Sequence, residues 1–270
     1  MMTRARFLSL AGLAAAAAFT RTACAGNGDG NGDDGGWRVV HAFVALADND
    51  AQGIAPVPPK IGDGDDPEHN LYWGCSDGLG AYFKASKQWK RIAAENDPAP
   101  GILRRHVFRH ASAKIALVAD AYRGSEIKRC TEAFLAAAAG AGESPAVGGI
   151  DGAGGLRAGA AADLVAYLGH NGLMDFKLPD PAHPAVQRDA IVLCCVSDSC
   201  FSARLRALGS RPVLMTRQLM YSGSFLLHDA IEGWRQGESA AAIRDRAANA
   251  YAKNQGISVK AARGVFADLE

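Results

Sequence analysis

Short runs of apolar residues recur along the chain and alternate with longer stretches that have the spacing of amphipathic helices. The runs lack the polar alternation of a half-buried strand, which is typical of strands buried on both faces of a parallel sheet. Five such strands are predicted, and they lie within residues 37–47, 114–121, 163–176, 189–201 and 212–216.

Helices are predicted between and after these strands, where apolar residues recur every three or four positions. They cover residues 71–89, 125–139, 200–208, 224–235, 239–253 and 259–268. Asn70 and Ser239 stand where an N-cap side chain is needed. Alternating strands and helices predict an α/β fold: a right-handed three-layer α/β/α sandwich with a mostly parallel central sheet, formed by residues 37–270 as a single domain.

The first 36 residues do not fit this pattern and are predicted to lie outside the fold. Residues 1–25 begin with Arg4 and Arg6, continue in an apolar run and end in an Ala-Cys-Ala triplet, which together indicate a secretory signal peptide. The alternatives are lipidation of Cys24, as in a lipoprotein, and retention of the leader as an anchor. Residues 26–36 contain only Gly, Asn and Asp, which favours a disordered linker over a calcium-binding loop. An exported protein, periplasmic or extracellular, is therefore expected.

Charge and hydropathy exclude two classes of partner. The chain has 29 Lys and Arg against 28 Asp and Glu, without the basic block that a nucleic-acid-binding face needs. No segment after the leader reaches 18 consecutive apolar residues, so the mature chain is expected to have no transmembrane segment.

Cysteines are informative in an exported chain, because such compartments favour disulfides. If Cys24 leaves with the leader, five remain: Cys75, Cys130, Cys194, Cys195 and Cys200. An odd count leaves at least one thiol free or joined to another molecule. A disulfide from Cys200 to Cys194 or Cys195 is one alternative, and Cys75 and Cys130 fit the pattern of buried, inert cysteines.

The strongest chemical signal is a histidine and a cysteine that end two consecutive apolar runs. His170 follows the run that opens 163–176, and Cys194 and Cys195 follow the run that opens 189–201. Parallel strands bring their carboxyl ends to one edge of a sheet, so His170 and Cys195 are expected to meet there. A neighbouring histidine favours the nucleophilic thiolate and can return the proton to a leaving group. The sequence thus predicts a Cys–His dyad for acyl transfer.

These motifs resemble the caspase-like clan of cysteine peptidases, which includes caspases, metacaspases, legumains and gingipains. The stretch 70–79, with Gly-Cys-Ser-Asp and a spaced Leu, is similar to the first helix of that clan. The resemblance implies a caspase-like fold in a divergent bacterial exported member, with His170 as base, Cys195 as nucleophile and Gly172 as donor of an oxyanion-binding N–H. Cys194 takes the small-residue place and is the alternative nucleophile. The implied substrate is a peptide or protein, and neither a cofactor nor a metal is expected.

Two further functions stay open on the sequence. A catalytically silent, caspase-like protein of the cell envelope would bind a partner through its long loops; one of these, residues 52–70, is also placed to wall a substrate cleft. A metal or redox role for Cys194, Cys195 and Cys200 is the other.

Two weaker motifs are set aside. His106 and His110 would have metal-ligand spacing on a helix, but no third ligand lies nearby in the sequence, which favours a structural or surface role. Residues 221–224 (YSGS) lack the second glycine of a nucleophile elbow, which disfavours a serine hydrolase.

Overall fold

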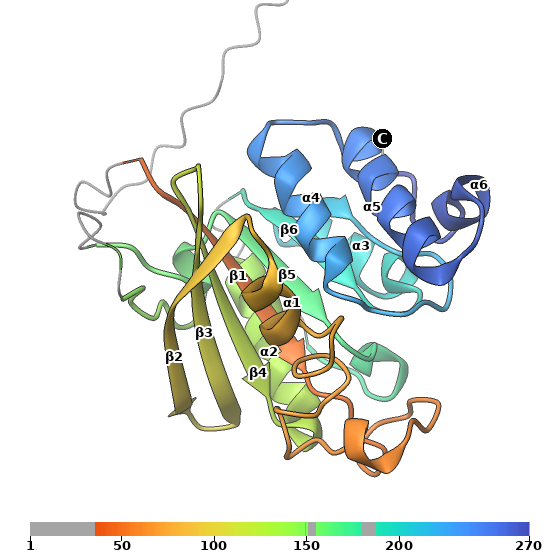
Figure 1. Cartoon of the computed structure of the whole chain (residues 1–270), viewed down its shortest axis with the longest axis horizontal. Helices are drawn as coiled ribbons and strands as arrows, with labels where there is room; N and C mark the ends of the chain where they lie inside the picture. The colour runs from red at the N-terminus through yellow and green to blue at the C-terminus, as the bar shows by residue number, and fades with distance from the viewer. Residues whose placement is uncertain (1–35, 149, 151–154, 180–186, 270) are drawn as a thin grey trace, which may run out of the picture. The chain divides into compact units, whose positions relative to one another are not determined.

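A seven-stranded sheet forms the centre of the computed structural model of the protein (Figure 1). The structure describes residues 36–148, 150, 155–179 and 187–269, and these belong to one compact unit. The strand order is β2-β3-β4-β1-β5-β6-β7. The strands are β1 (Arg38–Ala45), β2 (Trp89–Ala99), β3 (Ile102–His110), β4 (Ile115–Tyr122), β5 (Leu164–Leu168), β6 (Asp189–Leu193) and β7 (Arg211–Leu214).

Five of these strands are parallel and match the apolar runs of the sequence. β4, β1, β5, β6 and β7 lie side by side in that order, each parallel to its neighbour. β4 and β5 are buried along their whole length, because both faces of this part of the sheet are covered. The prediction of an α/β fold with a mostly parallel sheet is confirmed.

An antiparallel hairpin completes the sheet and was not predicted. β3 pairs antiparallel with both β4 and β2, and Gly101, with a φ of +82°, lies in the turn that joins β2 to β3. The helix predicted for residues 71–89 is wrong in extent, since only α1 (Leu79–Ala85) is helical and Trp89 already begins β2. Residues 71–78 form turns instead, in which Gly74 packs against the backbone of Glu68 too closely for a side chain.

Helices cover both faces of the sheet. Alternate residues of β1 point to opposite sides: Val39 and Phe43 join one apolar cluster, and Val40 and Val44 join the other. The first cluster contains residues of α2 (Ile127–Ala138) and α3 (Ser197–Ala207). The second contains residues of α1, α4 (Phe225–Arg235), α5 (Ala240–Gln255) and α6 (Val259–Arg263). The described residues therefore form three layers.

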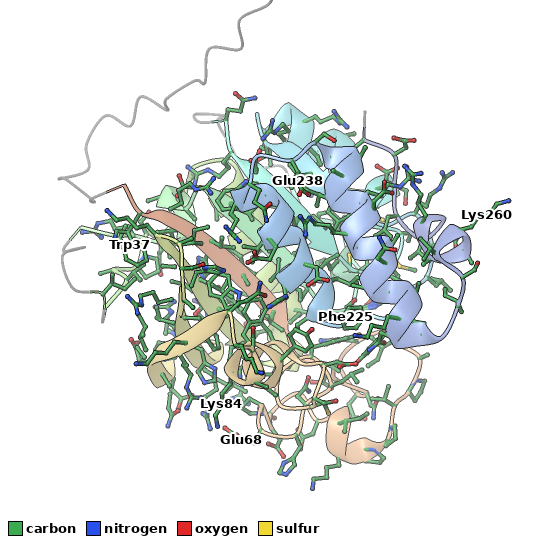
Figure 2. All side chains as sticks on the ribbon, turned by 45° about the horizontal axis from the view of Figure 1, so that its top comes forward. Trp37, Glu68, Lys84, Phe225, Glu238 and Lys260 are labelled. Atoms are coloured by element: carbon green, nitrogen blue, oxygen red, sulfur yellow. The ribbon has the colours of Figure 1, made fainter. Side chains whose placement is uncertain are left out.

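Side chains on this framework follow the layers. Figure 2 shows Phe225, which is buried, at the start of α4, and Lys260, which is exposed, reaching outward from α6. α6 ends at Arg263, earlier than predicted, and the following residues return to the edge of the sheet. There the N–H of Arg217 donates to the carbonyl of Val265, and the N–H of Ala267 donates to the carbonyl of Met215.

The order of the strands reverses direction at β1. From β1 the chain continues to β4 on one side, and β5 then lies on the other side of β1. Where the direction of winding reverses in this way, the loops beyond the two carboxyl ends separate and leave room for a ligand. The candidate chemistry is thus expected beyond the ends of β1, β5 and β6.

Several predictions fall on parts of the chain that are not described. The signal peptide of residues 1–25, the lipidation of Cys24 and residues 26–35 of the linker lie outside the described residues. Within the described ranges, no helix is both long and apolar enough to cross a membrane.

Candidate active site

His170 and Cys195 lie at the same edge of the sheet, beyond two adjacent strands. Leu168 pairs with Leu193 in the β5–β6 ladder, so each of the two residues lies two positions past a paired strand end. The N–H of Gly169 donates to the carbonyl of Leu193 across the strand ends at 3.4 Å. The fold therefore delivers both side chains to the expected place.

His170 is held by a carboxylate. Its Nε2 lies 2.8 Å from Oδ2 of Asp175, and the same oxygen accepts a hydrogen bond from the N–H of Gly53 at 3.0 Å. The hydroxyl of Tyr167 donates to the carbonyl of His170 at 2.8 Å and fixes the backbone. Since Nε2 is engaged by Asp175, Nδ1 is the nitrogen left for a reacting group. A carboxylate that orients a histidine in this way is a recurrent feature of nucleophilic sites.

The 3₁₀ turn η4 (Gly172–Met174) brings Asp175 back to His170. Asn171 caps this turn, because its side-chain oxygen accepts from the N–H of Leu173 at 3.1 Å. The other end of the same amide donates to the carbonyl of Cys195 at 2.7 Å. Asn171 is fully buried and thus couples the histidine loop to the cysteine turn. Sequence reasoning assigned no role to Asn171 or Asp175.

Cys195 lies in a sharp turn between β6 and α3. Val196, the next residue, has a left-handed backbone with a φ of +46° and a ψ of +37°, which is unfavourable for a β-branched side chain. Strain of this kind persists only where the surrounding contacts hold it, and it is enriched at functional sites. The turn places Cys195 two residues before Ser197, the first residue of α3.

Buried hydroxyl groups hold this turn. The hydroxyl of Ser197 donates to the carbonyl of Val192 at 2.9 Å, and the hydroxyl of Thr216 donates to the carbonyl of Cys194. Ser197 and Thr216 also contact each other through their hydroxyls at 3.1 Å. The two sides of the turn, β6 and the end of β7, are therefore tied together below the thiol.

The thiol of Cys195 faces the segment that follows β7. Its Sγ accepts from the N–H of Met220 at 3.4 Å and lies 3.6 Å from the Met220 carbonyl oxygen. Among the described residues, no hydrogen bond joins Sγ to the imidazole of His170. The structure thus brings the two predicted residues to one edge of the sheet, and their side chains make no direct hydrogen bond there.

Cys194 is the weaker nucleophile of the neighbouring pair. Its side chain is fully buried, and burial, followed by the proximity of Cys195 and Cys200, raises the pKa of the Cys194 thiol well above its usual value. A thiol with a raised pKa supplies little thiolate near neutral pH. Burial also raises the pKa of the Cys130 thiol far above its usual value, in agreement with the expectation of an inert cysteine.

The predicted disulfide alternatives are not formed. Cys75, Cys130, Cys194, Cys195 and Cys200 are all free thiols. In the described ranges, no group of three or more His, Cys, Asp or Glu side chains could hold a metal ion. The metal role suggested for Cys194, Cys195 and Cys200 therefore has no cluster to support it.

Gly172 begins the η4 turn, and its neighbours explain why a small residue is needed there. A Cβ atom on Gly172 would lie 2.6 Å from Cζ of Phe176, so a larger residue here would require the Phe176 ring to shift. Its N–H makes no hydrogen bond within the described part of the chain and remains a candidate donor to an oxyanion.

The loop of residues 52–70 contacts the histidine segment. Besides the contact of Gly53 with Asp175, buried Asn70 accepts from the N–H of Ala47 at 3.0 Å and donates to the carbonyl of Ala47 at 2.8 Å. Asn70 was predicted to cap a helix; it instead ties the loop to the chain just beyond β1. Burial, then Cys195 and Cys194, raises the pKa of the nearby Tyr72 hydroxyl, which keeps that hydroxyl protonated beside the thiol.

Exposed apolar side chains flank the site. Met174, beside Asp175, is 52% exposed, and Leu219, beside Met220, is 72% exposed. Large side chains with this exposure are few in the described ranges, and two of them adjoin the histidine and cysteine segments. They form an exposed apolar surface on either side of the histidine and cysteine segments.

The two remaining histidine candidates are structural. His106 and His110 lie on strand β3 and not on a helix, so they lack the ligand geometry of a helical i, i+4 pair. His110 is buried and its Nε2 lies 3.0 Å from Oε1 of Glu232 on α4.

Comparison of the chain with protein-family models, curated proteins and solved structures finds no significant match.

Proposed function

We propose that the protein is a cysteine-dependent peptidase of caspase-like architecture that acts after export. The observation that carries the proposal is the delivery of Cys195 and an Asp175-oriented His170 to the carboxyl ends of adjacent parallel strands. This order of a histidine strand followed by a neighbouring cysteine strand is what the caspase-like resemblance requires. The left-handed backbone of Val196 and the exposed apolar side chains of Met174 and Leu219 also support a substrate-binding site at this edge.

In the proposed reaction, Sγ of Cys195 attacks the carbonyl carbon of a peptide bond as a thiolate. The proton taken up by His170 passes from Nδ1 to the leaving amine as the C–N bond breaks and a thioester forms. Water, deprotonated by His170, then attacks the thioester, which releases the acid and regenerates the thiol. Asp175 keeps the ring oriented throughout, and the N–H of Gly172 stabilises the oxyanion.

A catalytically silent binding protein is the second candidate. The observation that favours it is the position of the thiol, which contacts the backbone of Met220 and not the imidazole. The two candidates differ in one measurable property, the dependence of thiol reactivity on His170.

Alkylation by iodoacetamide tests the proposal. The reduced protein is labelled between pH 5 and pH 9, the rates at Cys195 and Cys75 are followed by mass spectrometry, and both are compared in wild type, His170→Ala and Asp175→Asn. Burial and then Asp77 raise the pKa of the Cys75 thiol, which makes Cys75 a slow internal reference. We expect Cys195 to react about tenfold faster than Cys75 at pH 6, and to lose this advantage in His170→Ala.

The matched control is His69→Ala. His69 also pairs with a carboxylate, Asp66, and this pair is exposed in the loop of residues 52–70. Because the thiol of Cys75 donates to the carbonyl of His69, the rate at Cys195 itself is compared in this control, and not its ratio to the rate at Cys75. The His69→Ala substitution should leave the alkylation rate at Cys195 unchanged. Equal rates at Cys195 and Cys75 in the wild type, or equal rates with and without His170, would exclude the peptidase and favour the binding protein.

A further inference from the structure

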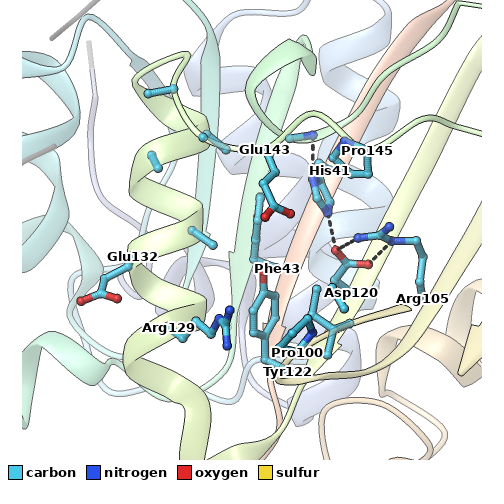
Figure 3. Close-up of a pocket in the computed structure, with 18 residues that line it drawn as sticks. His41, Phe43, Pro100, Arg105, Asp120, Tyr122, Arg129, Glu132, Glu143 and Pro145 are labelled. Carbon is cyan, nitrogen blue, oxygen red and sulfur yellow. Dashed lines mark hydrogen bonds and ion pairs between the residues drawn. The ribbon is translucent and has the colours of Figure 1, made fainter. Parts of the chain in front are cut away.

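A cavity of about 310 Å³ lies between α2 and the sheet, and none of its lining residues belongs to the candidate active site (Figure 3). The sheet side presents the rings of His41, Phe43 and Tyr122. The helix side presents small residues, including Ala133, Ala136 and Ala137. Opposed walls of rings and methyl groups make a narrow slot, which fits a flat apolar group.

A buried ionic network forms one wall of this cavity. Asp120, which is fully buried, accepts two hydrogen bonds of 2.6 Å from Arg105, through Nε and Nη2. Nε2 of His41 lies 3.0 Å from the same carboxylate, and the N–H of Gly159 donates to Nδ1 of His41 at 2.8 Å. Nδ1 is therefore an acceptor, so the ring proton lies on Nε2 and is donated to Asp120.

This network is internally neutral and structurally costly. The positive charge of Arg105 and the negative charge of Asp120 cancel, and the histidine in the tautomer just described adds no charge. Burying such a pair is a weak source of stability compared with packing apolar residues of the same volume. The proposed reaction at Cys195 makes no use of it, so its place in the wall of a cavity indicates a separate role.

Two further charged side chains line the cavity without pairing. Arg129 of α2 and Glu143 of the following loop make no ion pair with any described residue, and both are exposed at the mouth. Figure 3 shows both directed toward Phe43, whereas Glu132 points away. The mouth thus offers one unpaired positive charge and one unpaired negative charge above an aromatic floor.

We propose that this cavity binds a zwitterionic α-amino acid with a flat apolar side chain. The carboxylate of the ligand contacts Arg129, its ammonium group contacts Glu143, and its side chain lies between Phe43 and the alanines of α2. A ligand of a single charge would pair with one of these two exposed groups and leave the other beside it without an opposite charge. A molecule that carries both charges satisfies both.

Calorimetric titration of the full-length protein tests this site with four probes. L-Phenylalanine carries all three features, phenylacetate lacks the ammonium group, phenethylamine lacks the carboxylate and L-alanine lacks the ring. We expect saturable binding of L-phenylalanine and affinities weaker by about tenfold or more for the other three. Binding of phenylacetate or phenethylamine as tight as that of L-phenylalanine would overturn the zwitterion assignment.

Variants on exposed or partly exposed positions of α2 locate the binding. Arg129→Gln should weaken L-phenylalanine about tenfold or more, and Ala136→Leu should abolish binding because it fills the slot. Lys128→Gln is the matched control, since Lys128 is exposed on the same helix but does not line the cavity. Thermal unfolding of each variant verifies the fold. No saturable binding of L-phenylalanine up to roughly 10 mM, or equal affinity in all three variants, would refute the proposal.

Discussion

The stability of the protein should depend on pH through His106, a residue of β3 with no place in the proposed reaction. His106 is 8% exposed, its ring packs 4.9 Å from that of Trp73, and its Nδ1 is buried without a hydrogen-bond partner among the described residues. Burial, followed by the positive charges of Arg91, Arg104 and Lys84, lowers the pKa of His106 from 6.5 to about 4. In the folded protein, burial and the neighbouring positive charges therefore oppose protonation of the His106 ring.

The sign and size of the effect follow from linkage. Because the unfolded chain takes up the proton near pH 6.5 and the folded chain only near pH 4, the unfolded state binds more protons between these values. The free energy of unfolding is then highest above about pH 6.5, falls as the pH drops, and levels off below about pH 4. The full loss is about 3 kcal/mol, of which about 2 kcal/mol is reached at pH 5.

Urea unfolding at pH 7.5 and pH 5, followed by circular dichroism, measures this loss in wild type and in His106→Phe. The variant keeps an aromatic ring beside Trp73 but has no titrating group at this position. Between pH 7.5 and pH 5, the free energy of unfolding of the wild type should therefore fall by about 2 kcal/mol more than that of the variant. His69→Gln, which removes an exposed histidine, should keep the wild-type pH dependence. Parallel changes in wild type and His106→Phe would refute the reasoning.

Three substitutions near the candidate site give further tests. Val196→Gly should raise the free energy of unfolding by about 1 kcal/mol, measured by urea titration, because it relieves a left-handed backbone; a loss of stability would show that the valine contacts outweigh the strain. Gly169→Ala should lower the same free energy by about 2 kcal/mol or more, since φ is +138° and the added Cβ would lie 2.7 Å from the carbonyl oxygen of Ala45; an unchanged value would contradict this. Asn171→Leu should cost about 1–3 kcal/mol and slow alkylation of Cys195, whose carbonyl loses its donor; unaltered alkylation would separate Asn171 from the site.

The parallel part of the fold could be predicted because its strands are continuous apolar runs. β1 and β4 are buried on both faces, and only such burial makes a strand apolar at every position. The β2–β3 hairpin was not predicted because β2 is an edge strand with mostly exposed residues. Its composition, with Lys, Ala and Glu, is also that of an exposed surface helix. What makes β2 a strand is pairing with β3, a contact that composition does not encode.

The candidate site shows the same division. The positions of His170 and Cys195 at strand ends follow from local pattern and from the rule that parallel strands share an edge. The roles of Asp175 and Asn171 depend on how one short loop folds back, and on the register that brings this loop beside the turn of Cys195. Neither is visible as a periodicity, although both lie within a few residues of His170.

The hydroxyl ties of Ser197 and Thr216 bear on how the protein could be controlled. They fix the main chain on both sides of Cys195, so the backbone of this turn is held whichever way the thiol points. Switching by ordering and disordering of the cysteine turn is thereby disfavoured. The adjustable parts are the segment around Met220, which contacts the thiol, and the loop around Gly53, which contacts the histidine's carboxylate. An inhibitor or natural regulator of this protein is expected to act by moving or covering these two segments, while the turn itself stays as it is.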